Sequence, residues 1–211
     1  VLHPLLTATQ ENNYKGTEGF GAIPFDGIVL AHSNESEWKT FRNNKNNEAF
    51  LDRIYIVKVP YCLRVSEEVK IYEKLIRNSS LAAAKCAPGT LKMMSQFAAL
   101  TRLKEPENSS LYSKMQIYDG ENLKDTDPRA KSYQEYRDYA GVDEGMSGIS
   151  TRFAFKIISK VFNFDSQEVA ANPVHLMYVL EQQIEREQFP KELEDKYVGF
   201  IKELLAPRYA E

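Results

Sequence analysis

The sequence lacks the short motifs by which many proteins bind nucleotide phosphates. It contains no G-x-x-x-x-G-K-[ST] loop, no apolar strand that ends in paired acidic residues, and neither of the strings H-R-D and D-F-G. The first absence excludes a phosphate cradle of that type, and the second excludes the Mg²⁺ carboxylates that accompany it. The missing strings exclude the common catalytic loop and metal-binding loop of protein kinases.

Cysteine, long apolar runs and surplus positive charge are also scarce. The two cysteines, Cys62 and Cys86, lack C-x-x-C spacing, which predicts reduced cytosolic thiols rather than disulfides or a zinc site. No apolar run approaches the roughly 20 residues that cross a bilayer, and no signal-peptide pattern is present. We therefore expect no membrane partner and a cytoplasmic location. The net charge of -3 argues against a nucleic-acid partner.

Metal ligands are not expected either. The three histidines, His3, His32 and His175, have no metal-ligand spacing, and His175 lies in an apolar helical pattern that favours a packing role. The remaining composition, with 43% hydrophobic and 27% charged residues among 211, is that of ordinary globular protein. Because the first residue is Val1 and no phosphate loop is present, we expect the chain to be a fragment of a larger protein.

The N-terminal quarter of the chain predicts a small amount of β structure. Residues 12–25 are rich in Gly and Pro, which favours a hairpin or an exposed loop. Residues 27–34 and 54–60 are short apolar runs that predict buried strands. Between them, residues 35–52 predict a polar helix with a break at 43–47.

Almost everything after Pro60 predicts helix. Apolar residues recur at helical spacing from Val65, from Thr90, over 149–163, from Pro173 and from Pro190. Pro128 is a candidate first residue of another helix, and the polar stretch 104–127 is the best candidate for a mobile surface loop.

Three polar residues are candidates for chemistry. Asn34 follows the first predicted strand, where a carboxamide can orient a water beside a phosphate; the alternative is a helix cap. Arg53 precedes the second strand, where a forked guanidinium can reach the phosphate of a neighbouring subunit; the alternative is a surface salt bridge. Arg152 lies in the first turn of a helix, against the helix dipole, which suggests a nearby anion; the alternative is a salt bridge to Asp143 or Glu144.

The order of these features is that of the second half of an AAA+ ATPase module. Long strings of the sequence also resemble the PrkA family of bacterial serine protein kinases, and the resemblance covers essentially the whole chain. The strings that carry it are FDGIVLAHSNESEW, NNEAFLDRIYIVKVPYCLRVSEEVKIYEKL, LKEPENSSLYSKMQIYDGENLKDTDPRAKSYQEYRDY, GISTRFAFKIIS and NPVHLMYVLEQQIEREQFP.

The resemblance implies a fold and a set of roles. Family members are cytoplasmic, linked to stress responses or sporulation, and carry an AAA+ module followed by a kinase-like domain. The implied fold is mostly α with a small β remnant: a truncated AAA+ core over residues 1–62, a helical lid region over 63–171 with a long loop at 104–127, and the helical start of the C-terminal domain over 172–211.

The same resemblance implies that Asn34 is the sensor-1 asparagine, Arg53 the arginine finger and Arg152 the sensor-2 arginine, with Arg42 a second candidate for the finger. ATP and Mg²⁺ are then the cofactors of the full-length protein, with neither expected to bind this fragment tightly. A protein substrate and a homo-oligomer are its expected partners.

Two other functions stay open. The AAA+ layout equally suits a protein-remodelling machine or a Lon-like protease motor, although no Ser-Lys pair stands out. A non-catalytic helical interaction module is the third hypothesis.

Overall fold

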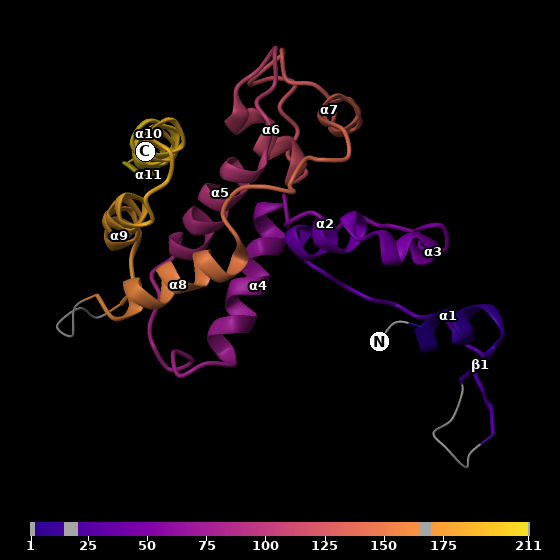
Figure 1. The fold of residues 1–211 in the computed structure, drawn as a ribbon. Helices are drawn as coiled ribbons and strands as arrows, with labels where there is room; N and C mark the ends of the chain where they lie inside the picture. The colour runs from indigo at the N-terminus through magenta and orange to yellow at the C-terminus, as the bar shows by residue number, and fades with distance from the viewer. Residues whose placement is uncertain (1–2, 15–20, 165–169, 211) are drawn as a thin grey trace. The chain divides into compact units, whose positions relative to one another are not determined.

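The computed structural model describes residues 3–14, 21–164 and 170–210. The chain divides into two compact units, Val1–Val57 and Lys58–Glu211, here called the first and second units. Helices dominate both units, and a two-stranded sheet is the β structure of the described residues (Figure 1). The prediction of a mostly helical chain with little β structure is therefore confirmed.

The first unit begins with a helix and a small sheet. Helix α1 (His3–Gln10) precedes strand β1 (Asn13–Tyr14), which pairs antiparallel with β2 (Ile23–Pro24). The ring of Tyr14 packs edge-on against Phe25, with 5.2 Å between ring centroids. For the Gly- and Pro-rich stretch, the sequence left a hairpin or an exposed loop open, and the antiparallel pairing favours the hairpin.

The polar helix and its predicted break are also present. Helix α2 (Glu35–Asn43) is followed by a 3-10 turn (Lys45–Asn47) and by α3 (Glu48–Leu51). Asn44 causes the break, because its side chain accepts a hydrogen bond from the backbone N–H of Asn46 and starts a new turn. Stacked and edge-on rings of Trp38, Phe41 and Phe50 hold the pieces together.

The two strands predicted over 27–34 and 54–60 are absent. Both segments are extended without strand pairing, and their apolar side chains are largely exposed, at 89% for Ile28, 92% for Leu30 and 68% for Val57. The prediction was wrong because a strand forms only when a neighbour supplies its hydrogen bonds. Within the described residues, no neighbouring strand pairs with either segment.

The second unit is built of helices. Its elements are α4 (Val65–Arg77), α5 (Thr90–Arg102), α6 (Leu111–Tyr118), α7 (Tyr133–Ala140), α8 (Thr151–Phe162), α9 (Pro173–Arg186), α10 (Lys191–Gly199), a π-helical turn (Phe200–Leu205) and α11 (Ala206–Ala210). No described helix is long and apolar enough to cross a membrane.

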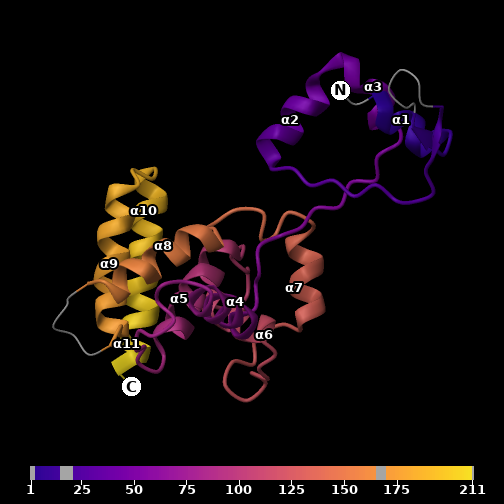
Figure 2. The ribbon, with the colours of Figure 1, turned by 90° about the horizontal axis from the view of Figure 1, so that it is seen from below.

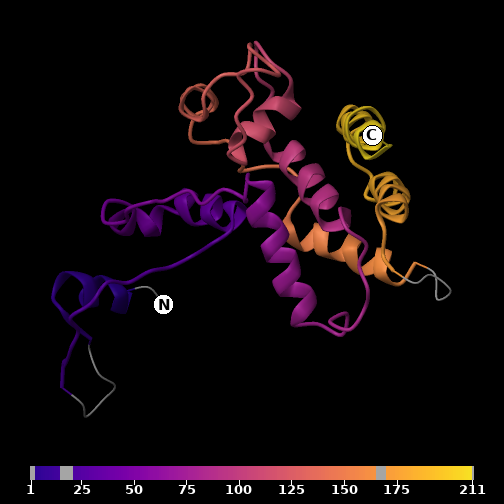
Figure 3. The same cartoon turned by 180° about the vertical axis from the view of Figure 1, so that it is seen from behind.

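Helix α5 is the centre of the second unit. It packs against α4, α6, α8, α9 and the π-helical turn, and Figures 1 and 3 show it between its neighbours from opposite sides. Met94, Phe97, Ala98 and Leu100 on this helix have no exposed surface. Figure 2 shows α8, α9 and α10 side by side, consistent with the packing of α8 on α9 and of α9 on α10. The core thus gathers around one apolar helix.

The stretch 104–127 is not a long loop. It contains α6, whose Leu111, Met115 and Tyr118 are buried at helical spacing. The prediction failed because polar residues surround this short apolar stripe, and one of them, Lys114, is itself buried through an ion pair. The apolar stripe of α6, rather than the average polarity of residues 104–127, decides that this stretch forms a helix.

The helix predicted from Pro128 starts five residues later. Ser132 caps α7 through a capping box, in which its side chain accepts from the N–H of Glu135 and the Glu135 carboxylate accepts from the Ser132 backbone. This reciprocal pair satisfies two free backbone donors, so it fixes the helix start more strongly than the proline does.

Candidate functional site

Asn34 caps a helix in this structure. Its side-chain Oδ1 accepts a hydrogen bond of 2.7 Å from the backbone N–H of Glu37, and the residue is exposed at the start of α2. This is the cap that the sequence offered as the alternative, and Glu35 and Glu37 in the first turn suit the helix dipole. The cap holds the carboxamide in a fixed place, but the segment before it is not a strand.

Arg53 lies just after α3, at the start of the second extended segment. The side chain is exposed, and its Nη1 donates to the carbonyl oxygen of Ala49 in the preceding turn. The salt bridge offered as the alternative is not among the ion pairs of the described residues. Arg42, the second candidate for the same role, is exposed in the last turn of α2.

Arg152 lies in the first turn of α8 with its side chain exposed. The two carboxylates proposed as its salt-bridge partners are engaged elsewhere: Asp143 pairs with Lys58 at 2.5 Å, and Glu144 pairs with Lys114. The hydrogen bond from Lys58 lowers the pKa of Asp143 below its ordinary value. The salt bridge proposed for Arg152 is therefore wrong for both acids, and the residue is exposed at the positive end of a helix.

The three candidate residues do not lie in one unit. Asn34 and Arg53 belong to the first unit and Arg152 belongs to the second. Each is exposed and therefore accessible to a ligand, and their roles stay predictions. Within the described ranges, no three His, Cys, Asp or Glu side chains are grouped to hold a metal ion.

Sequence reasoning missed a buried polar junction where the end of α5 meets the start of α8. All three nitrogens of the Arg102 guanidinium donate a hydrogen bond here. Nε donates to the carbonyl oxygen of Ile149 at 2.8 Å, and Nη1 donates to that of Cys62 at 2.7 Å. Nη2 donates to the Glu68 carboxylate at 2.9 Å. The Arg102 and Glu68 side chains are 0% and 1% exposed. A buried ion pair of this kind fixes one arrangement of the elements that carry it.

The Glu68 carboxylate gathers several donors at this junction. Besides Arg102, its Oε1 accepts from the hydroxyl of Tyr72 at 2.7 Å and from that of Thr151 at 3.3 Å. Burial and the nearby Glu68 charge raise the pKa of Tyr72, so its hydroxyl stays a donor. Helical spacing could have found Glu68, because it shares the buried face of α4 with Val65 and Tyr72.

A second buried pair joins α6 to the segment before α8. The Lys114 ammonium contacts the Glu144 carboxylate and the carbonyl oxygen of Lys104, and Glu144 also accepts from the Tyr118 hydroxyl and from the Lys104 N–H. The donors and acceptors of this cluster satisfy one another. The arrangement therefore has the character of a structural network rather than of a reactive site.

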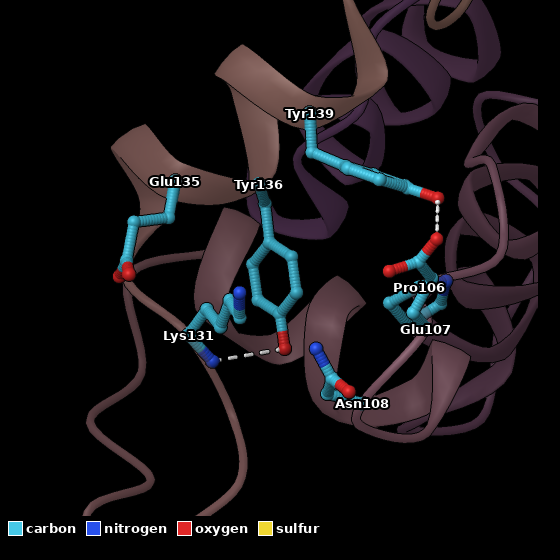
Figure 4. A pocket seen from close by; sticks show the side chains of 7 residues that line it. All are labelled: Pro106, Glu107, Asn108, Lys131, Glu135, Tyr136 and Tyr139. Atoms are coloured by element: carbon cyan, nitrogen blue, oxygen red, sulfur yellow. Dashed lines mark hydrogen bonds between the residues drawn. The ribbon is translucent and has the colours of Figure 1, made fainter.

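A small hollow of the described surface lies beside α7. It is lined by residues including Pro106, Glu107, Tyr136 and Tyr139, and it has room of about 30 Å³ (Figure 4). Among the residues that line it, the Tyr139 hydroxyl donates to the Glu107 carboxylate at 2.7 Å. It holds little more than a water molecule, and none of the three candidate residues lines it.

Two family models match this chain. A family model described as the PrkA AAA domain matches residues 1–110. A second, described as the PrkA serine protein kinase C-terminal domain, matches residues 112–211. The chain belongs to the PrkA family. Asn34 and Arg53 therefore lie in the stretch matched by the AAA domain, and Arg152 lies in the stretch matched by the C-terminal domain.

Individual relatives of the PrkA family are similar along the whole chain. The chain is 77% identical over 211 residues to the serine/threonine kinase YeaG of Escherichia coli (strain K12), covering 100% of this chain and 33% of that protein. It is 38% identical over 208 residues to the ATP-dependent protease PrkA of Bacillus subtilis (strain 168), covering 95% of this chain and 31% of the relative. The chain thus spans about a third of the length of these relatives. No solved structure matches it.

Proposed function

We propose that the whole protein is an ATP-dependent serine/threonine protein kinase and that this chain carries the residues that sense its nucleotide. The observation that carries the proposal is the 77% identity, over every residue of this chain, to a relative named a serine/threonine kinase. The roles proposed are water orientation for Asn34, a finger offered to the neighbouring protomer for Arg53, and contact with the γ-phosphate for Arg152.

The surroundings of Arg152 support its proposed role. Arg152 is exposed on the first turn of α8, where a helix favours an anion, and the two acids suggested as its partners, Asp143 and Glu144, pair with lysines. A phosphate oxygen would gain from both the helix end and the fixed positive charge. The phosphate-binding loop and the Mg²⁺ carboxylates would come from other parts of the whole protein, since this sequence contains no such loop.

The proposed assembly is a homo-oligomer in the cytoplasm that acts on a protein substrate. An arginine finger works only when the nucleotide of an adjacent protomer lies within its reach, so Arg53 implies contact between copies. The exposed apolar segments 28–30 and 54–59 are further support, because such residues are usually covered in a complete protein.

The second candidate function is an ATP-dependent protease or remodelling motor. The observation that favours it is the 38% identity to a relative named an ATP-dependent protease. A purified full-length protein incubated with γ-labelled ATP and casein separates the two functions. Label on serine or threonine supports the kinase, whereas release of acid-soluble peptides without labelled protein supports the protease.

The third candidate, a helical interaction module without a nucleotide role, makes a different prediction. It requires that Arg53→Ala and Arg152→Ala leave ATP turnover of the full-length protein unchanged. A loss of turnover in either variant, with melting temperature preserved, excludes this function.

A further inference from the structure

The first turn of α8 is attached to the rest of the second unit by bonds from two other helices. Thr151, the first residue of α8, donates its hydroxyl to Glu68 on α4. Two residues earlier, the Ile149 carbonyl accepts from Arg102 and the Ile149 N–H donates to Thr101 Oγ1 at 3.0 Å, both at the end of α5. Arg152 follows directly, so its backbone position is set by these contacts.

The backbone also approaches closely at this place. Gly148 has φ of +100°, and a Cβ there would lie 2.5 Å from the carbonyl oxygen of Thr101. Only glycine lets the chain pass the end of α5 at this distance. The entry to α8 is therefore restrained by side chains and by the path of the backbone.

Glu68 retains unused capacity for bonding. Its Oε1 serves three donors, whereas Oε2 is buried and has no hydrogen-bond partner among the described residues. Buried carboxylate oxygens normally have a partner. Glu68 therefore has a second acceptor oxygen to spare at this junction, beside the one that the Thr151 hydroxyl uses.

We propose that Glu68 and Thr151 are positioning residues for Arg152: the Thr151 hydroxyl, held by the buried Glu68–Arg102 pair, sets where Arg152 meets the γ-phosphate. The inference rests on the proposed function of Arg152. It adds that the matched AAA stretch (Glu68, Arg102) controls an arginine in the matched C-terminal stretch, so the two stretches act as one nucleotide-reading element.

The test uses the full-length protein with a fluorescent analogue of ATP and a fluorescent analogue of ADP. For each variant, the dissociation constants of both analogues and the melting temperature are measured. Thr151→Val keeps the volume and removes the hydroxyl, whereas Thr151→Ser keeps the hydroxyl. Thr151→Val should weaken binding of the ATP analogue about tenfold, the size expected for a lost bond to a charged group. Thr151→Ser should bind as the wild type does.

The ADP analogue distinguishes positioning from general damage. Because Arg152 is assigned to the γ-phosphate, ADP binding should stay within about twofold in Thr151→Val. Thr90→Val is the matched control, since Thr90 is the first residue of α5 and its hydroxyl donates to the Ala87 carbonyl at 2.9 Å without touching α8. It should change the melting temperature and leave the ATP-to-ADP affinity ratio unchanged.

A double variant that combines Thr151→Val with Arg152→Ala tests whether Thr151 acts through Arg152. If Thr151 acts through Arg152, then Thr151→Val adds no further loss to Arg152→Ala. An additional loss in the double variant, or equal weakening of ATP and ADP binding, would overturn the positioning role. Wild-type affinity in Thr151→Val together with weak ATP binding in Arg152→Ala overturns the positioning role alone. Wild-type ATP affinity in Arg152→Ala overturns the proposed function of Arg152 and the positioning role with it. Thr151→Ala serves as the second hydroxyl-free variant if Thr151→Val melts early.

Discussion

At the scale of single residues, Arg102 holds more of the second unit together than a surface charge could. Its guanidinium joins three separate backbone or side-chain acceptors, and the Tyr61 ring lies 5.1 Å from its centre. Removing one partner of a buried ion pair leaves the other charge without compensation, which is more damaging than removing both.

Arg102→Met should therefore destabilise the second unit by about 3–5 kcal/mol, because it leaves the Glu68 charge buried and unpaired. Urea unfolding followed by the helical circular dichroism signal of the 211-residue chain measures this. The double variant Arg102→Met with Glu68→Leu removes both charges and should recover part of the loss. A double variant less stable than Arg102→Met would contradict the ion-pair account.

Cys62 provides a residue-scale test of burial. Burial raises the pKa of its thiol above the ordinary value of 9.0, and Arg64 accepts a hydrogen bond from it. Burial disfavours the charged thiolate, so the thiolate forms only at higher pH. In a Cys86→Ser background, the iodoacetamide rate should reach its half-maximum above pH 9.0. A midpoint at or below that pH would show that the thiol is not protected as described.

At the scale of elements, side chains cap the start of five of the described helices, whereas α4, α5 and α10 begin without a side-chain cap. Asn34, Ser110, Ser132, Ser150 and Asn172 each accept a backbone hydrogen bond at a helix start. In α7 the cap rather than Pro128 sets the start, whereas α9 begins with a cap and a proline together, Asn172 and Pro173.

The capping box of α7 makes a prediction about pH. Hydrogen bonds from the Ser132 hydroxyl and backbone lower the pKa of Glu135 from its ordinary 4.5. A lowered folded-state pKa contributes stability above pH 4.5, which is lost as pH falls through the lower folded value. Glu135→Gln should therefore lower the melting temperature at pH 7 and have a smaller effect at pH 3. An equal effect at both pH values would show that the negative charge of Glu135 does not contribute to the stability of the cap.

Apolar spacing was sufficient to predict α4, α5, α8 and α9, because each carries buried apolar residues at helical spacing. It was not sufficient for α6, whose stripe is short, or for the two predicted strands, whose partners are not in the chain's described part. The Arg102–Glu68 junction was also missed: helical spacing places Glu68 on the buried face of α4, but its pairing with Arg102 joins residues far apart in sequence. Local pattern predicts helices well and contacts between them poorly.

At the scale of the whole molecule, the family models divide the chain at residues 110–112, while the compact units divide at Val57. The second unit therefore includes the end of one matched stretch and all of the other. Arg102 and Glu68 lie on one side of the boundary between the family models, and Ile149 and Thr151 lie on the other. Because buried contacts cross this boundary, the two matched stretches are packed together within one folded unit.

The isolated 211-residue chain should bind ATP only weakly, because the residues that would cradle the phosphates are not in its sequence. Calorimetric titration with MgATP should give no saturation below the high-micromolar range. Nanomolar or low-micromolar affinity would mean that these residues form a complete site by themselves.

The central claim is that this chain reads a nucleotide through its arginines. The most direct test is steady-state ATP turnover of the full-length protein with Arg53→Ala and, separately, Arg152→Ala, each checked for an unchanged melting temperature. The account predicts a loss of about 10³-fold or more for Arg53→Ala, the effect of removing an arginine finger, and a clear loss for Arg152→Ala. Wild-type turnover in both variants would contradict it.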